Sequence, residues 1–211
     1  MGRDFSFNDV VDFDSHISNS IPSYDGLTSL VQRIAADYAQ DNTSVVDLGC
    51  STGKLLKEMH KKDTVQYIGV DNSFNPAHSD VEFFHADLLD YEIPKSSVVI
   101  SLFTLQFLPL RKRKNIIKQV SKKLVDGGVF ICAEKVHTVG RHLEVSLQNE
   151  LLNQKRRHFT DEEILDKSIG LSSVMRCRTA NELRRELASV GDVDSVWQWG
   201  QFICHVVTKE K

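Results

Sequence analysis

One short stretch decides the fold: residues 45–53 read VVDLGCSTG, an apolar run that ends in a glycine turn. The run before Gly49 is typical of a short buried strand, and apolar side chains recur at helical spacing after Gly53. Because glycine lets the backbone turn sharply and lets a ligand lie against it, a strand, glycine turn and helix indicate a nucleotide-binding unit. The stretch predicts a ligand at the carboxyl end of the first strand of an open sheet.

Two further acids follow expected strands. The strand at residues 66–70 ends at Asp71, about twenty residues after Gly49, where a carboxylate can accept hydrogen bonds from both ribose hydroxyls. A third strand, residues 81–85, leads to Asp87, which suits the amino group of an adenine, with Leu88 packing on the ring. The alternative for Asp87 is a turn cap.

The acid before the glycine turn indicates the ligand class. Enzymes that bind NAD usually have three glycines there and hold a diphosphate on the helix N-terminus. Here the third position is not glycine, and Asp47 stands two residues before the turn. A carboxylate suits a cationic, phosphate-free ligand, and S-adenosylmethionine (SAM) carries a sulfonium and an amino acid tail. The charges therefore favour SAM; the alternative is a turn that only packs a helix, with surface acids around it.

The other expected elements alternate in the same way. Helices are predicted at residues 24–38, 53–62 and 111–124, strands at 97–101 and 129–133, and a C-terminal hairpin at 193–197 and 202–207. A helical segment covers about 139–187, with breaks near 159–160 and at Gly170. The predicted fold is α/β and Rossmann-like, the class I methyltransferase fold, with a mostly parallel seven-stranded sheet, helices on both faces and a closing antiparallel hairpin. We divide the chain into an N-terminal arm and helix, 1–43, and a SAM-binding domain, 44–211, that contains the helical insertion.

Composition limits the partners. The net charge is −3 at pH 7, so a globally basic nucleic-acid footprint is absent. Two basic runs, 111–114 and 155–158, are read as solvated helix faces or, alternatively, as phosphate-contacting patches. No apolar run approaches the roughly 18 residues of a membrane helix, and no histidine or cysteine cluster has metal spacing. The four scattered cysteines predict free thiols in a reducing compartment, so we expect a soluble, cytoplasmic protein without a metal.

The run FTLQFL at residues 103–108, together with the glycine stretch and the VDNS of residues 70–73, resembles the carboxy-S-adenosyl-L-methionine synthase family. The resemblance covers nearly the whole chain. It implies conversion of SAM to carboxy-SAM with prephenate as carboxyl source, a product used to modify wobble uridine in tRNA, and a homodimer. It also places eight residues at cofactor-contacting positions, to which the charge argument adds Asp47: Tyr24, Gly49, Cys50, Ser51, Asp71, Asn72, Asp87 and Leu88.

Two positions depart from the family pattern. The family has an asparagine just before FTLQFL, where this chain has Leu102, and a carboxylate-pairing arginine where this chain has Ser168. Serine cannot reproduce the two parallel bonds of a guanidinium, so Arg157, Arg176 and Arg178 are candidates to replace it.

Three functions therefore stay open: methyl transfer from SAM to tRNA or a small molecule, carboxy-SAM synthesis, and SAM binding without catalysis. No catalytic residue is identified. In-line displacement at a sulfonium needs alignment and a dry cavity more than a nucleophile. Glu134, at the end of the fifth expected strand, is a speculative general base, with a salt bridge as the alternative.

Overall fold

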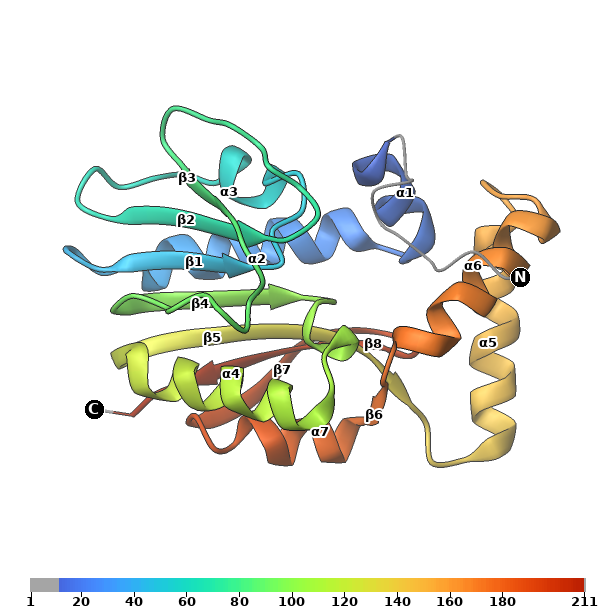
Figure 1. Ribbon diagram of the computed structural model, residues 1–211. Helices are drawn as coiled ribbons and strands as arrows, with labels where there is room; N and C mark the ends of the chain where they lie inside the picture. Colours follow the sequence, from blue (N-terminus) through green and yellow to red (C-terminus); the bar gives the residue numbers. More distant parts are fainter. Residues whose placement is uncertain (1–11, 211) are drawn as a thin grey trace.

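The computed structural model describes residues 12–210, which form one open α/β sheet flanked by helices (Figure 1). The strands are β1 (Ser44–Leu48), β2 (Gln66–Asp71), β3 (Glu82–His85), β4 (Ser96–Leu102), β5 (Leu124–His137), β6 (Arg178–Thr179), β7 (Asp192–Trp199) and β8 (Phe202–Thr208). The helices are α1 (Phe13–Ser20), α2 (Tyr24–Tyr38), α3 (Lys54–Glu58), α4 (Leu110–Lys123), α5 (Arg141–Lys155), α6 (Asp161–Val174) and α7 (Ala180–Leu187), with a 3-10 turn, η2 (Leu105–Phe107).

The sheet has the expected topology. Its order is β3-β2-β1-β4-β5-β8-β7. The strands β3, β2, β1, β4 and β5 run parallel to one another, and β8 pairs antiparallel with both β5 and β7. The predicted mostly parallel sheet with a closing hairpin is therefore confirmed. The short β6, not predicted, adds an eighth strand that pairs with the end of β5, where Val136 lies opposite Arg178.

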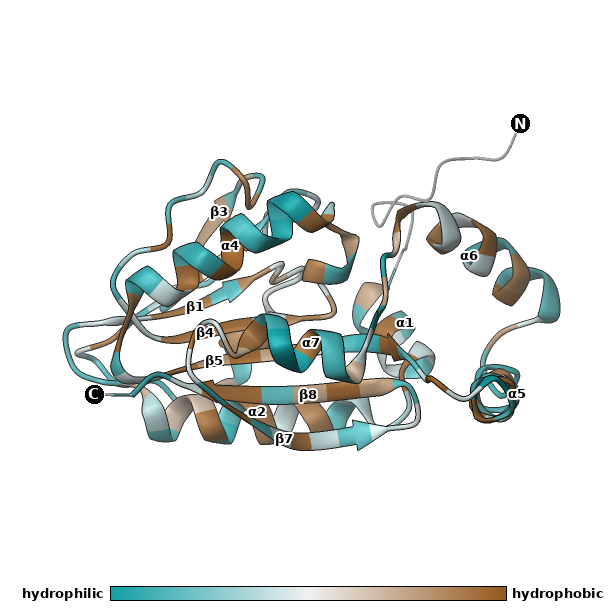
Figure 2. Cartoon of the chain, turned by 90° about the horizontal axis from the view of Figure 1, so that it is seen from below, coloured by the Kyte–Doolittle hydropathy of each residue, from teal (hydrophilic) through white to brown (hydrophobic). Residues whose placement is uncertain are grey.

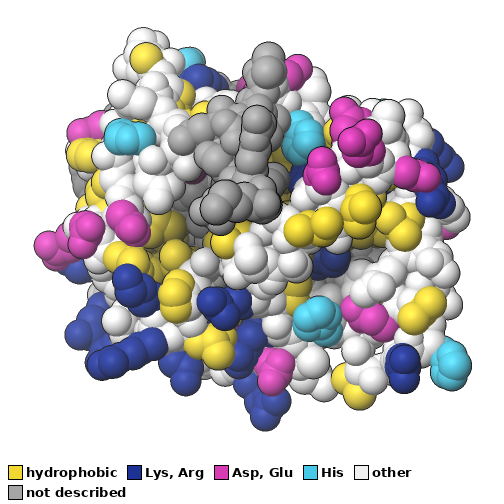
Figure 3. Space-filling view, turned by 45° about the vertical axis from the view of Figure 1, so that its right-hand side comes forward, with side chains coloured by type: hydrophobic (Ala, Val, Ile, Leu, Met, Phe, Trp, Pro, Cys, Tyr) yellow, Lys and Arg dark blue, Asp and Glu magenta, His cyan; other side chains and the backbone are white. Residues whose placement is uncertain are grey.

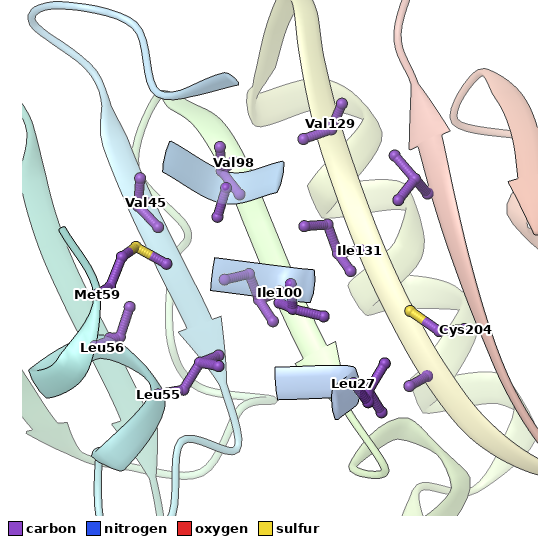
Figure 4. Packing of buried hydrophobic residues seen from close by; sticks show 14 of the residues in the cluster. Leu27, Val45, Leu55, Leu56, Met59, Val98, Ile100, Val129, Ile131 and Cys204 are labelled. Atoms are coloured by element: carbon purple, nitrogen blue, oxygen red, sulfur yellow. The ribbon is translucent and has the colours of Figure 1, made fainter. Parts of the chain in front are cut away.

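Helices cover both faces of the sheet. On one face, α2 and α3 bury Leu27 and Leu56 against Val45, Val98 and Ile131 (Figure 4). On the other, α4 and α7 pack against the alternate residues of the same strands, and Figure 2 shows the apolar colour gathered on the strands and on the helix sides facing them. Each fully buried aliphatic side chain contributes roughly 1.5–3 kcal/mol to this core. Helix α2 belongs to the part we assigned to the N-terminal arm, yet it packs on the sheet of the other part. The division of the chain at residue 43 stays a prediction.

Three predicted boundaries were wrong. The helix expected at 53–62 ends at Glu58, and the strand expected at 129–133 is longer, since β5 begins at Leu124 and ends at His137. The expected break at Gly170 does not occur, because α6 continues to Val174. One interior glycine costs only about 1 kcal/mol. The capping box at Thr160, whose hydroxyl accepts from the Glu163 N–H, stabilises the start of the same helix.

Helices α5 and α6 lie beyond the carboxyl ends of the parallel strands, beside α1 (Figure 1). A hydrogen bond of 2.8 Å from Lys167 Nζ to Ser20 Oγ joins α6 to α1. None of the helices within residues 12–210 combines the length and apolar character needed to cross a membrane. The helical insertion and the N-terminal helix thus form one wall around the sheet edge where ligands bind in open α/β folds.

Candidate cofactor and substrate cavity

A cavity of about 270 Å³ opens at the carboxyl ends of β1, β2 and β4. Its walls also come from α1, α2, α5 and α6. All nine residues predicted to contact the cofactor line this one cavity: Tyr24, Asp47, Gly49, Cys50, Ser51, Asp71, Asn72, Asp87 and Leu88. That they contact SAM stays a prediction.

The glycine turn brings the backbone against the cavity. Gly49 has a φ of +81°, and a Cβ there would lie 2.3 Å from the Thr104 side chain. The amides of Gly49 and Cys50 both donate to the carbonyl of Val70, which holds the turn against β2. The Ser51 hydroxyl is buried and finds no hydrogen-bond partner among the described residues. A polar ligand in the cavity would satisfy it, as the turn's expected role requires.

Asp71 organises the two loops around the cavity. One carboxylate oxygen accepts from the Ser51 amide at 2.9 Å, and the other accepts from the Ser73 and Phe74 amides at 2.7 and 3.1 Å. These bonds fix the carboxylate at the end of β2. The oxygen that accepts only from Ser51 keeps a free lone pair, so a ribose hydroxyl of a nucleoside could donate to it, whereas the other oxygen already accepts two bonds.

Asp47 is a buried carboxylate that lines the cavity. Its residue is 4% exposed, and within residues 12–210 no hydrogen bond or salt bridge reaches it. Burial, followed by repulsion from Asp71, raises its pKa to about 7. A buried carboxylate that faces a cavity without a partner is costly unless a cation enters. The geometry therefore fits the ammonium of an amino acid tail.

Asp87, Leu88 and Cys50 also line the cavity. The carboxylate of Asp87 accepts from the Leu89 amide at 2.9 Å, so it caps a turn and also lines the cavity, while Leu88 is buried beside it. Burial, with Asp47 and Asp71 nearby, raises the pKa of the Cys50 thiol. Since a protonated thiol is a poor nucleophile, Cys50 is unsuited to covalent catalysis.

The FTLQFL run forms the opposite wall. Phe103 has a φ of +57°, and its ring lies 6.3 Å from Tyr24 and 5.8 Å from Phe202, centroid to centroid. Gln106 accepts from the Lys135 amide at 2.8 Å and receives the Arg176 amide at its carbonyl at 2.7 Å. The run thus ties β5 and the chain after α6 to the cavity.

Four lysines of the described chain line the cavity, none of them placed there by the sequence reasoning: the exposed Lys54 at the start of α3 and three from other elements. Lys135 from β5, Lys155 from the end of α5 and Lys167 from α6 all line it and are half-buried. Burial, followed by repulsion from Lys135, lowers the pKa of Lys155 to about 8; burial and Lys155 lower the pKa of Lys167 to about 7. Lys155 belongs to a run that was read as a solvated face or phosphate patch, and its local sequence carries no signal of burial.

The two family departures fall differently in the structure. Leu102 lines the cavity, whereas Ser168 is exposed on α6 and does not. The proposed replacements do not reach it either: among the residues lining the described cavity, Arg157, Arg176 and Arg178 are missing.

Glu134 is not a candidate base, because it is fully buried and paired with Arg113, which also bonds Glu186 at 2.7 Å. Its alternative interpretation, a salt bridge, is confirmed.

Comparison with known proteins identifies the family. A domain family described as a methyltransferase domain matches residues 23–167. The carboxy-S-adenosyl-L-methionine synthase of Staphylococcus epidermidis is 32% identical, with 94% of this chain and 92% of that protein covered. The chain belongs to the carboxy-S-adenosyl-L-methionine synthase family. The carboxy-S-adenosyl-L-methionine synthase of Wolinella succinogenes is 31% identical over 98% of this chain and 94% of its own length.

Solved structures agree on the fold. One similar structure is the N-methyltransferase NodS from Bradyrhizobium japonicum in complex with S-adenosyl-L-homocysteine (SAH). The superposition has a TM-score of 0.62 and covers 95% of this chain and 94% of the NodS chain. At 11% identity this likeness shows the class I methyltransferase fold alone. The methyltransferase domain and membership of the carboxy-S-adenosyl-L-methionine synthase family together show that the chain is a SAM-dependent transferase. Its cofactor is SAM.

Proposed function

We propose that the chain converts SAM to carboxy-SAM, with prephenate as the carboxyl donor. One hydrogen of the sulfonium methyl group is replaced by a carboxyl group. Prephenate gives up its ring carboxylate and ring hydroxyl as it becomes the aromatic phenylpyruvate, and the hydroxide and the methyl proton leave as water.

The observation that carries the proposal is the pair of acids at the glycine turn, in a chain that matches carboxy-SAM synthases over nearly its full length. Asp47 would pair with the ammonium of the methionine tail and Asp71 would hold the ribose. Asp87 and Leu88 would meet the adenine. Held in this way, SAM would have its methyl group in the same cavity as Leu102, Phe103 and the lysines, where the second substrate would bind.

Mass spectrometry of the adenosyl product tests the proposal. Purified protein incubated with SAM and prephenate is expected to give a sulfonium compound in which carboxyl replaces one hydrogen, together with phenylpyruvate. Omitting prephenate should leave SAM unchanged. Unchanged SAM in the complete mixture would contradict carboxy-SAM synthesis.

Methyl transfer is the second candidate, and Leu102 favours it. An aliphatic side chain in place of the family's asparagine removes an amide from the reacting end of the cavity. Labelled SAM offered to RNA, protein and small-molecule pools would then mark an acceptor. An unlabelled result in every pool, with no carboxy-SAM formed, would favour SAM binding without catalysis.

A homodimer is proposed on the exposed face of the helical insertion. Leu165 and Ile169, one turn apart on α6, are each 59% exposed, and Leu143 on α5 is 56% exposed. Figure 3 turns this side forward and shows hydrophobic side chains reaching the surface in several groups. Sedimentation should give a dimer that the pair Leu165→Glu and Ile169→Glu dissociates, while Leu110→Glu on α4 does not. A monomeric wild type would refute it.

The family resemblance also suggests a use for the product and a compartment for the protein. We propose that carboxy-SAM made here serves wobble-uridine modification of tRNA in the cytoplasm, where the free thiols of Cys50, Cys132, Cys177 and Cys204 would stay reduced. Direct tRNA contact would use the exposed basic side chains of α4, and its affinity would fall steeply with salt. Binding that ignores salt would argue against such contact.

A further inference from the structure

We propose that Lys135, Lys155 and Lys167 form an anion subsite that binds a small dicarboxylate with an apolar body, the second substrate of the reaction. The inference rests on the proposed function, because a carboxyl donor must carry at least one carboxylate. It assigns that binding to three lysines, although the position of the family's arginine is occupied by Ser168.

The three lysines converge from separate elements. Lys135 comes from β5, Lys155 from the last turn of α5 and Lys167 from the second turn of α6, yet all line the same cavity. Their charges are close enough that Lys135 lowers the pKa of Lys155, and Lys155 lowers the pKa of Lys167. Cations gathered in a half-buried wall repel one another, and an anion between them would remove that cost.

The three lysines lack a carboxylate partner within residues 12–210. Within the described chain, none of the three forms a salt bridge with an aspartate or glutamate. Lys167 Nζ contacts His16 Nε2 and donates to Ser20 Oγ, both neutral groups: burial, followed by repulsion from Lys167, lowers the pKa of His16 to about 4. The Lys155 ammonium forms no hydrogen bond to another described residue; the two bonds that the Lys155 carbonyl accepts come from the His158 and Phe159 amides. The acids that line the cavity come from other elements than the three lysines, with Asp47 and Asp71 at the strand ends. The others are Asp14, Asp25, Glu58 and Asp87.

The surroundings of the lysines indicate the shape of the anion. The ammonium of Lys135 lies 6.0 Å from the centroid of the Phe202 ring, and Leu171 and Met175 line the same wall. A substrate with charged groups and an apolar ring would bury the ring there and direct its carboxylates to the lysines. Up to three positive charges suit a dianion better than a single carboxylate.

The test separates binding of the donor from binding of SAM. Lys155→Gln, Lys167→Gln and the double variant are compared with wild type and with Lys122→Gln, a control at an exposed position of α4. Steady-state kinetics gives KM for prephenate and kcat. Calorimetry gives the Kd for SAM, and the Kd for prephenate with SAH-saturated protein. Each single substitution should raise the prephenate KM and Kd about ten- to hundredfold and leave the SAM Kd within about threefold. Lys122→Gln should have the prephenate KM and Kd of wild type. Lys155→Arg keeps the positive charge and should therefore lose much less prephenate affinity than Lys155→Gln.

Each other outcome decides against one claim. If wild type makes carboxy-SAM and the lysine variants keep their prephenate KM within about twofold, the subsite is refuted while the proposed function stands. If the variants lose SAM affinity to the same degree as prephenate affinity, the lysines hold the cofactor tail and the subsite is again refuted. If wild type makes no carboxy-SAM but its SAH complex binds prephenate in a lysine-dependent way, carboxyl transfer fails and the anion subsite stands.

Discussion

Replacing the buried carboxylate Asp47 by asparagine should separate stability from cofactor binding. A pKa raised from 3.8 to about 7 means that the ionised form is disfavoured in the folded protein by about 4 kcal/mol. An asparagine side chain would keep the shape of the carboxylate without its charge. We therefore expect Asp47→Asn to be more stable than wild type at pH 8, by roughly 1–3 kcal/mol after the cost of a buried amide. SAM affinity should fall about ten- to hundredfold, because the ammonium loses a charge-assisted partner.

The pH dependence fixes the sign of the stability effect. The folded protein holds the Asp47 proton more tightly than the unfolded chain, so this group stabilises the fold at low pH. That stability is lost as pH rises from about 4 to about 7. The advantage of Asp47→Asn should therefore be small near pH 4.5 and full near pH 8. Urea unfolding at both pH values and calorimetry with SAM measure it, with Asp63→Asn at an exposed loop position as control. Wild-type SAM affinity in Asp47→Asn would refute the reasoning.

Three further substitutions test the scaffold. Gly49→Ala places a Cβ 2.3 Å from Thr104 at a φ of +81°, so it should lower the free energy of urea unfolding by about 3 kcal/mol. The control Gly26→Ala has open space around it in α2 and should stabilise the protein slightly. Equal effects of the two substitutions would contradict the turn geometry. Arg113→Met leaves Glu134 and Glu186 buried without a cation and should lower the free energy of unfolding by about 3–5 kcal/mol. The control Lys112→Met should leave that free energy nearly unchanged. An unchanged free energy of unfolding in Arg113→Met would refute the ion network. Thr160→Ala removes the capping box of α6 and should cost about 1 kcal/mol in the same assay, and no loss would show that α6 does not depend on its cap.

The sheet and the cofactor end could be predicted because their signals are local. Strand runs, the turn at Gly49 and the acids that follow each strand need only a few neighbouring residues to be recognised. Once the strands are parallel, their carboxyl ends meet at one edge, so Asp47, Asp71 and Asp87 had to lie together. The register of β1 against β2 confirms that the first two end side by side.

The place of the lysines in the cavity could not be predicted because it depends on how the helical insertion folds back. Lys155 and Lys167 sit in polar helix sequence and look like solvent-facing residues until α5 and α6 are placed across the strand ends. Arg113 shows the same difficulty: it belongs to a basic run, yet its partners Glu134 and Glu186 lie 21 and 73 residues away in sequence. Long-range pairs of this kind leave no periodic pattern. A single glycine such as Gly170 does not end α6, because packing and the cap at Thr160 outweigh its low helix propensity.

The most direct measurement is the mass of the small molecule that co-purifies with the protein and is released on denaturation. A cavity lined by Asp47, Asp71 and the lysines should retain SAM or its carboxylated form. Recovery of a dinucleotide, or a protein that arrives empty and takes up neither SAM nor SAH when soaked in them, would contradict the account.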